Sequence, residues 1–275
     1  MNDKFIGYVS YVQHKSGCLS IAGKHCVVTG GSGRIGSVFT THLLDCGAQV
    51  ISLSRSHQRF VEFAESLPIA LQEKLHWVEF DLASPKSFPD ARSRILEIAP
   101  TVDILVNNAS TSNRGANFSY KTESLEAEMW GVFGGSVLFT EMLLPSLRVN
   151  GKGLVINVGS IIGHLAPNLE MYLDLDIGPT PMLSCGKAAI AQYSSYLASR
   201  EAKFGIRANT LIPGFFPRKG PVERSDYMEQ LHHKTPLRRI GKLEDLVAAV
   251  AFLLSEGSSF FTGQTLIVDG GYSIW

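Results

Sequence analysis

The chain has 275 residues, of which 45% are hydrophobic, and its 25 lysines and arginines balance its 25 aspartates and glutamates. This length and apolar content suit one large α/β domain, and the balanced charge gives no electrostatic footprint for nucleic acid or an anionic membrane. The four cysteines show neither CxxC spacing nor a His-rich pattern, which predicts reduced thiols and no metal site.

Residues 1–20 are expected to form an appended N-terminal arm, followed by a single domain over residues 21–275. The arm lacks the apolar run of a signal peptide. No window approaches the roughly 20 apolar residues of a membrane span. We therefore expect a soluble, cytoplasmic protein with no membrane partner.

From Lys24 onward, short β-branched runs alternate with stretches of helical period. Such near-continuous apolar strands indicate a parallel sheet covered on both faces. With right-handed crossovers, the expected fold is α/β: a Rossmann-like, doubly wound, seven-stranded parallel sheet with helices on both faces. The expected strands are His25–Thr29, Gln49–Leu53, Leu75–Phe80, Val102–Asn107, Leu154–Val158, Arg207–Ile212 and Thr265–Val268. The expected helices are Ile35–Cys46, Gln58–Gln72, Ser87–Ala99, Glu123–Leu147, Ser184–Lys203 and Glu244–Leu254.

A glycine-rich turn, TGGSGRIG over residues 29–36, follows the first expected strand and opens the first helix. Small residues let the backbone approach a pyrophosphate, whose negative charge then faces the helix N-terminus. The alternative, a plain tight turn between strand and helix, is weakened by further matching stretches. The cofactor-binding residues predicted in this turn are Gly30, Ser32, Gly33, Arg34, Ile35 and Gly36.

The second expected strand is followed by Ser54 and Arg55, where an NAD enzyme usually carries an acidic residue for the ribose hydroxyls. A guanidinium group can fork onto a ribose 2′-phosphate, and Arg34 adds a second cation nearby. We therefore favour NADP(H) over NAD(H). The alternative is that Arg55 is a solvated loop residue.

Together with the glycine-rich turn, four further stretches resemble the short-chain dehydrogenase/reductase family over residues 22–273. The stretches are Asp81-Leu82, Asn107–Ala109, Ile206–Gly214 and Thr262–Gly271. The resemblance implies that the cofactor site also includes Asp81, Leu82, Asn108, Ala109, Lys187, Pro213 and Gly214. The glycine spacing is similar to that of a longer, sugar-nucleotide-modifying branch, but the chain length and tail match the single-domain branch.

The resemblance also exposes a gap at Leu183. The family carries Tyr-x-x-x-Lys here: the Tyr exchanges a proton with the reacting oxygen, and the Lys lowers the Tyr pKa and holds the nicotinamide ribose. This chain keeps Lys187, but Leu183 has no ionisable group and cannot do acid–base work. Ser160 stands where the family has its substrate-binding Ser; the alternative is a helix-capping serine.

A second departure lies at Val132, where many members carry an Asn that anchors a proton-relay water. The interval from Ser160 to Leu183 also contains an extra stretch, 166–181, which we expect to enlarge the rim of the substrate pocket. Tyr172 in this stretch is the predicted substitute acid, so the predicted catalytic set is Ser160, Lys187 and Tyr172. Weaker candidates, each with an exposed-residue alternative, are His164, Asp174, Asp176 and Cys185.

These features predict an NADP-dependent oxidoreductase that acts on a hydroxyl or carbonyl of a polar, sugar-like small molecule. A similar insertion occurs in a family branch associated with bacterial surface-sugar gene clusters. The basic loop 215–224 either receives an anionic substrate or is simply solvated. By resemblance, the helices over 123–147 and 184–203 form the contacts of a homodimer or homotetramer.

Two other functions stay open. One is a catalytically silent homologue, acting as a cofactor-binding regulator or as a subunit of a hetero-oligomer with an active relative. The other is a different reaction on the same scaffold, such as dehydration or isomerisation.

Overall fold

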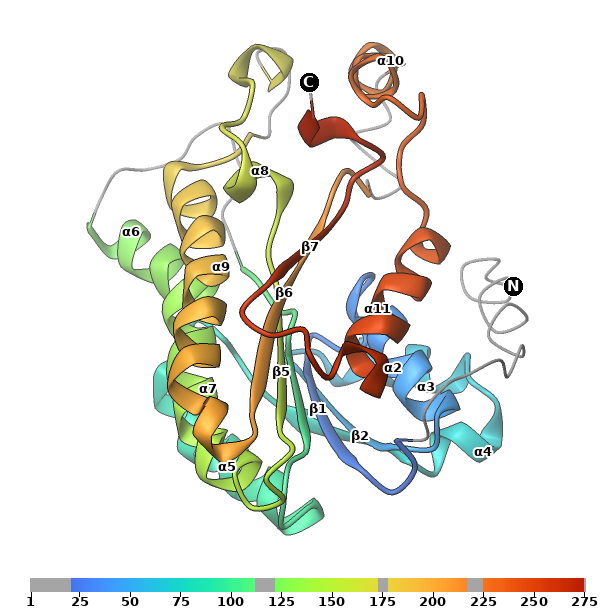
Figure 1. Cartoon of the computed structure of the whole chain (residues 1–275), viewed down its shortest axis with the longest axis vertical. Helices are drawn as coiled ribbons and strands as arrows, with labels where there is room; N and C mark the ends of the chain where they lie inside the picture. Colours follow the sequence, from blue (N-terminus) through green and yellow to red (C-terminus); the bar gives the residue numbers. More distant parts are fainter. Residues whose placement is uncertain (1–20, 112–121, 173–177, 217–224, 275) are drawn as a thin grey trace.

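The computed structural model describes residues 21–111, 122–172, 178–216 and 225–274, so the expected arm over 1–20 lies outside it. The described chain forms a seven-stranded parallel sheet with helices packed on both of its faces (Figure 1). The predicted fold class is therefore confirmed.

The sheet reverses its direction of growth between β1 and β4, because its order is β3-β2-β1-β4-β5-β6-β7. The strands are β1 (His25–Thr29), β2 (Gln49–Ser54), β3 (Leu75–Glu79), β4 (Ile104–Asn107), β5 (Leu154–Val158), β6 (Arg207–Pro213) and β7 (Thr265–Val268). Thr29 pairs with both Leu53 and Asn107, so β1, β2 and β4 end at one edge. Ligands of doubly wound sheets bind outside this edge, at the reversal point.

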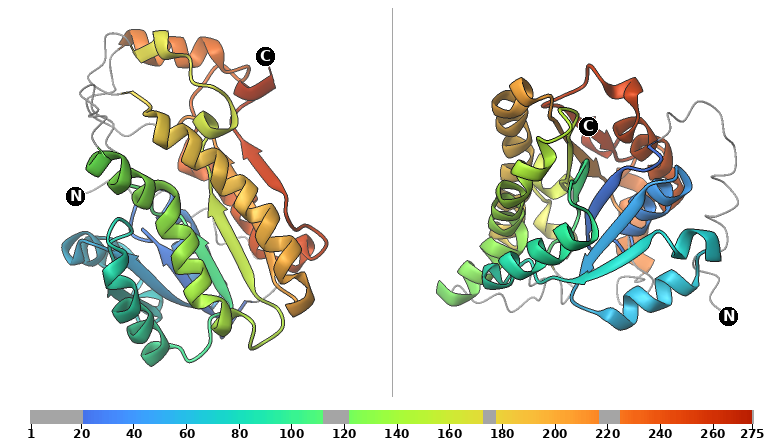
Figure 2. Two further views of the ribbon diagram at one scale, coloured as in Figure 1. Left: turned by 90° about the vertical axis from the view of Figure 1, so that its left-hand side faces the viewer. Right: turned by 90° about the horizontal axis from the view of Figure 1, so that it is seen from below.

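Two helical layers cover the sheet, as Figure 2 shows from two further sides. One layer contains α2 (Gly36–Asp45), α3 (His57–Glu65), α4 (Ile69–Gln72) and α11 (Val247–Leu254). The other contains α5 (Phe88–Ile98), α6 (Thr122–Met129), α7 (Gly135–Leu147) and α9 (Pro181–Glu201). Strand alternation separates the two cores: Cys26 and Val28 join the first and Val27 the second. The strands are thus apolar on both faces, as the sequence predicted.

The predicted helix over 123–147 is interrupted by a π-helical turn, η2 (Trp130–Gly134). The Gly131 carbonyl accepts a hydrogen bond from the Thr111 backbone N–H at 2.8 Å, a donor outside the helix. The whole run Thr122–Leu147 has the length and apolar composition of a membrane-crossing helix, but 56% of the tested window is buried inside the chain. A helix in the core of a globular protein can have the same length and apolar composition, so these two properties are weak evidence for a membrane span.

Two other predicted helices have different bounds. The expected helix over 58–72 is two helices, because Pro68 lacks a backbone N–H and stands just before α4. Helix α9 begins three residues before the expected Ser184, because Thr180 caps it and Pro181 occupies its first position. The sequence patterns also missed α8 (Ile161–His164) and α10 (Ser225–Lys234). These last two helices lie above the carboxyl edge of the sheet (Figure 1).

Candidate active site

The glycine-rich turn folds back onto the start of α2. Gly30 adopts a φ of +64°, which favours glycine. A Cβ at Gly36 would collide with the Gly30 carbonyl oxygen and lie 2.7 Å from Asn108 Nδ2. The turn therefore needs glycine at both positions. Of the other residues predicted here, Ser32, Arg34 and Ile35 are half-buried and Gly33 is exposed.

The end of β4 holds this turn in place through Asn108 and Ala109. The Asn108 Nδ2 donates to the Thr29 carbonyl at 2.9 Å and to the Gly30 carbonyl at 3.1 Å. The backbone N–H groups of Asn108 and Ala109 both donate to Thr29 Oγ1, at 3.0 and 2.9 Å. The sequence patterns did not single out Thr29, whose hydroxyl positions Asn108 and Ala109. A hydroxyl on the last residue of an otherwise apolar strand was the available signal.

Ser54 and Arg55, the residues predicted to bind the ribose end of the cofactor, lie at the end of β2. The Ser54 side chain is hydrogen-bonded within the protein. Its hydroxyl accepts a hydrogen bond from Trp77 Nε1 at 3.0 Å. Ser56, rather than Ser54, caps α3 by accepting from the Arg59 backbone N–H. The Arg55 side chain is exposed. Arg55 is thus left exposed at this strand end.

Asp81 and Leu82 follow β3 at the same edge of the sheet. Asp81 Oδ1 accepts from the Ala83 backbone N–H at 3.0 Å, which fixes the turn, and Leu82 is buried. Pro213 ends β6 and is buried, and the Gly214 N–H donates to the Val268 carbonyl at 2.9 Å. The predicted cofactor residues therefore lie at the carboxyl ends of β1, β2, β3, β4 and β6, except for Lys187 on α9.

Ser160 and Lys187 lie where β5 ends, because α8 packs tightly on α9. A Cβ at Gly163 would lie 2.6 Å from the Lys187 carbonyl carbon, so the two backbones touch there. Lys187 is buried, and its Nζ donates to the Val158 carbonyl at 2.9 Å. Ser160 precedes α8 in extended conformation, and its side chain makes no capping hydrogen bond. The half-buried Ser160 hydroxyl is thus unused by that helix.

Leu183 and Val132 form part of one apolar seam. Leu183 is 2% exposed and lies four residues before Lys187, on the same face of α9. Val132 is fully buried in η2, and its Cγ1 would lie 2.7 Å from a Cβ at Gly186. Leu183 and Val132, neither of which carries an exchangeable proton, therefore lie on the two sides of the contact between α9 and η2.

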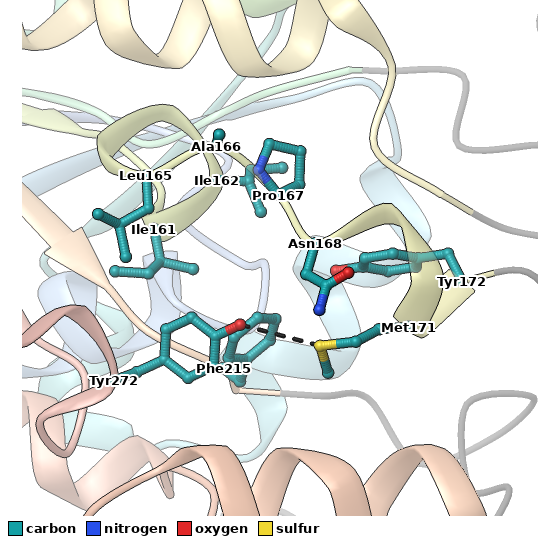
Figure 3. A pocket seen from close by; sticks show the side chains of 10 residues that line it. All are labelled: Ile161, Ile162, Leu165, Ala166, Pro167, Asn168, Met171, Tyr172, Phe215 and Tyr272. Carbon is teal, nitrogen blue, oxygen red and sulfur yellow. Dashed lines mark hydrogen bonds between the residues drawn. The ribbon is translucent and has the colours of Figure 1, made fainter. Parts of the chain in front are cut away.

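Tyr172 ends η3 (Leu169–Tyr172) and lines a pocket beside the start of α8. Figure 3 shows this pocket, whose walls come from the 161–172 segment, Phe215 and Tyr272. Neither Ser160, Lys187 nor Leu183 lines it. Tyr172 therefore lines a pocket whose wall includes Ile161, the neighbour of Ser160, and its role as the substitute acid stays a prediction. Of the weaker candidates, His164 and Cys185 are exposed, and Asp174, Asp176 and most of the basic loop (217–224) lie outside the described residues.

A chain of buried amides and hydroxyls crosses the sheet beneath this site. Asn107 Nδ2 donates to Asn157 Oδ1 at 2.8 Å, and Asn157 Nδ2 donates to Ser194 Oγ at 2.8 Å. Thr210 Oγ1 donates to the same Ser194 oxygen at 2.7 Å. The network joins β4, β5, β6 and α9, and fixes the strands that carry the site residues.

The chain is similar in sequence and fold to known proteins. The family model described as enoyl-(acyl carrier protein) reductase matches residues 32–273. The gluconate 5-dehydrogenase of Gluconobacter oxydans is 28% identical over 93% of this chain and 96% of its own.

Two solved structures extend the comparison. A short-chain dehydrogenase from Leptospira borgpetersenii with bound NAD+ is 29% identical with a TM-score of 0.79, covering 92% of this chain and 93% of its own. A gluconate 5-dehydrogenase from Burkholderia cenocepacia in complex with NADP and tartrate is 25% identical with a TM-score of 0.79, covering 93% and 97%. Because the family match spans most of the chain and these dehydrogenases share its fold, the protein belongs to the short-chain dehydrogenase/reductase family of oxidoreductases.

Proposed function

We propose that this oxidoreductase uses NADP(H) to interconvert a hydroxyl and a carbonyl on a polar, sugar-like metabolite, with an active site that lacks the usual tyrosine. The glycine-rich turn carries the cofactor part, because Gly30 and Gly36 provide the close backbone approach that a pyrophosphate needs. A bound nicotinamide supplies or accepts the hydride. Relatives solved with NAD+ and with NADP support this class of cofactor.

Two residues of the chain are suited to bind and orient the substrate and the cofactor. The Ser160 hydroxyl has no hydrogen-bond partner within the described ranges, which suits it to hold the substrate oxygen. Lys187, buried beside the end of β5, is suited to hold the nicotinamide ribose. Neither Leu183 nor Val132 can exchange a proton, so another group must do so.

The substrate class rests on the relatives and on the rim of the site. Gluconate 5-dehydrogenases occur among both the sequence relatives and the solved structures. The inserted segment adds Tyr172 to a pocket that also contains the Tyr272 ring, so two phenol side chains line its wall. We also propose a cytoplasmic homodimer or homotetramer built on α7 and α9. The exposed Tyr196 ring on α9 supports such a contact.

Replacing Arg55 with alanine tests the NADP(H) preference. We expect the Kd for NADPH to rise about 10- to 100-fold, because hydrogen bonds to charged groups contribute about 1.5–3 kcal/mol. The Kd for NADH should not change. Fluorescence titration of both cofactors measures this, with Arg59→Ala, an exposed arginine on α3, as the matched control. Equal weakening of both cofactors, or tighter NADH binding by the wild type, would remove the argument for NADP(H).

Replacing Leu183 with tyrosine separates an atypical enzyme from a silent homologue. We expect the wild type to reduce keto-sugars with NADPH, and the variant to gain less than the roughly 10²–10⁴-fold that a positioned proton donor is worth. The assay is NADPH oxidation with a panel of keto-sugar acids and polyols. Turnover by Leu183→Tyr alone would identify the wild-type protein as a silent cofactor-binding homologue.

A further inference from the structure

Helix α6 buries a carboxyl group that the sequence patterns did not single out. Glu128 is 4% exposed although it lies on a short polar helix. Its Oε2 has no hydrogen-bond partner within the described ranges. An unsatisfied buried carboxyl oxygen is costly, and such groups are retained mainly where they serve a function. Glu128 therefore requires an explanation beyond packing.

The other oxygen of this carboxyl contacts the start of α9. Thr180 Oγ1 donates to Glu128 Oε1 at 2.5 Å and accepts from the Leu183 backbone N–H at 3.0 Å. A hydroxyl oxygen has two lone pairs, so after accepting this N–H Thr180 Oγ1 can still donate to a Glu128 carboxylate or accept from a protonated Glu128. This distance is at the short end of the range for O–H···O hydrogen bonds. The carboxyl group and the position of the absent tyrosine are thus joined through one hydroxyl.

Glu128 also lies on the seam that contains both substituted relay positions. It precedes Val132 by four residues, about one helical turn, and Val132 packs on Gly186 of α9. Of the described side chains near this seam, Glu128 on α6 and Lys187 on α9 are ionisable and η2 carries none; Tyr193 lies further along the buried face of α9. The Lys187 ammonium donates to the Val158 carbonyl. Burial raises the pKa of Glu128, and the Thr180 hydrogen bond offsets part of that rise.

We propose that Glu128 is the proton reservoir of this site, exchanging a proton with the reacting oxygen through the Thr180 hydroxyl. The inference rests on the proposed function, which supplies the hydride. In reduction, the substrate oxygen gains its new O–H bond from Thr180 while Thr180 takes the Glu128 proton, leaving a carboxylate. Solvent then returns one proton to Glu128. In oxidation every transfer runs in reverse. Thr180 is the group that touches substrate, and Glu128 positions and refills it.

Infrared spectroscopy tests the reservoir without turnover. Ordinary glutamates ionise near pH 4.3. At higher pH we expect the wild-type spectrum still to show the C=O stretch of a protonated carboxyl group. This band should be missing from Glu128→Gln and present in Glu126→Gln, an exposed control on the same helix. A wild-type minus variant spectrum is needed, because burial also raises the pKa of Asp45 to about 6. A band that is equal in the wild type and Glu128→Gln would overturn the proposal.

The second arm follows NADPH oxidation with 5-keto-D-gluconate as the probe. Glu128→Gln keeps an acceptor for Thr180 but carries no exchangeable acid, so we expect a rate about 10²–10⁴-fold lower. The wild-type rate should fall as pH rises through the Glu128 pKa, and the variant should lose this dependence. Thr180→Val should match Glu128→Gln, and Thr180→Ser should restore the rate.

A purely structural role predicts a different pattern. Glu128→Gln would then change the melting temperature while leaving the pH profile in place, and that result would overturn the proposal. If no protein turns over the probe but the infrared band is lost in Glu128→Gln, the substrate class fails and the reservoir stands.

Discussion

Replacing Gly36 with alanine is expected to weaken cofactor binding strongly while the sheet still forms. The new Cβ would collide with the Gly30 carbonyl and press on the Asn108 side chain, which holds the turn. Overpacking of this kind costs about 1–3 kcal/mol. Because each 1.4 kcal/mol is tenfold, displacing the turn raises the Kd for NADPH at least about 10- to 100-fold. Fluorescence titration measures the Kd, and circular dichroism reports the fold.

The matched control for this variant is Gly178→Ala. Its nearest neighbour to a new Cβ would be Tyr172 Cβ at 3.8 Å, an ordinary contact, so cofactor binding should be unchanged. NADPH affinity that survives in Gly36→Ala would mean that the turn shifts without cost. In that case the turn is not the pyrophosphate site.

The largest expected loss of stability follows replacement of Glu201 with alanine. The Glu201 side chain is fully buried and accepts from Arg148 Nε and Nη2, both at 2.8 Å, and from Arg200 Nε at 2.7 Å. Breaking a buried pair costs about 3–5 kcal/mol. We expect about 3 kcal/mol, because the two arginines are 35% and 32% exposed and water can replace the lost acceptor.

Urea denaturation measures this loss against Glu97→Ala, an exposed glutamate on α5 that should change the free energy of unfolding by less than about 0.5 kcal/mol. The pH dependence provides an internal check. Hydrogen bonds from Arg148 and then Arg200 lower the pKa of Glu201. A lowered folded-state pKa gives stability that is present above the unfolded pKa, near 4.3, and is lost as pH falls through the folded value. The difference between wild type and Glu201→Ala should therefore shrink in acid; a constant difference contradicts the ion-pair explanation.

The fold was predictable because its signals are local. Cys26, Val27 and Val28 form an unbroken apolar run, which is what a strand buried on both faces requires. The glycine turn could be predicted for the same reason, since its sterics act between residues only six positions apart. The predicted helix bounds were wrong where a residue that starts or ends a helix was overlooked. Pro68 separates α3 from α4, and the Thr180 cap starts α9 earlier than predicted.

The rest of the site depends on contacts between distant residues. Tyr172 has suitable chemistry, but its place beside Phe215 and Tyr272 follows from how the inserted segment packs. Glu128 belongs to a polar helix whose sequence predicts exposure, yet it is buried and hydrogen-bonded to Thr180, which is 52 residues away. Sequence spacing cannot predict such pairings without the tertiary structure.

The polar network beneath the site has a consequence for folding kinetics. Its links join Asn107 to Asn157 and Asn157 to Ser194, across separations of 50 and 37 residues. Such long loops must close before any of these bonds can form, and an intermediate that buries the amides unpaired would be penalised. The β4–β6 half of the sheet should therefore consolidate late and as one cooperative unit, with its amide hydrogens exchanging together.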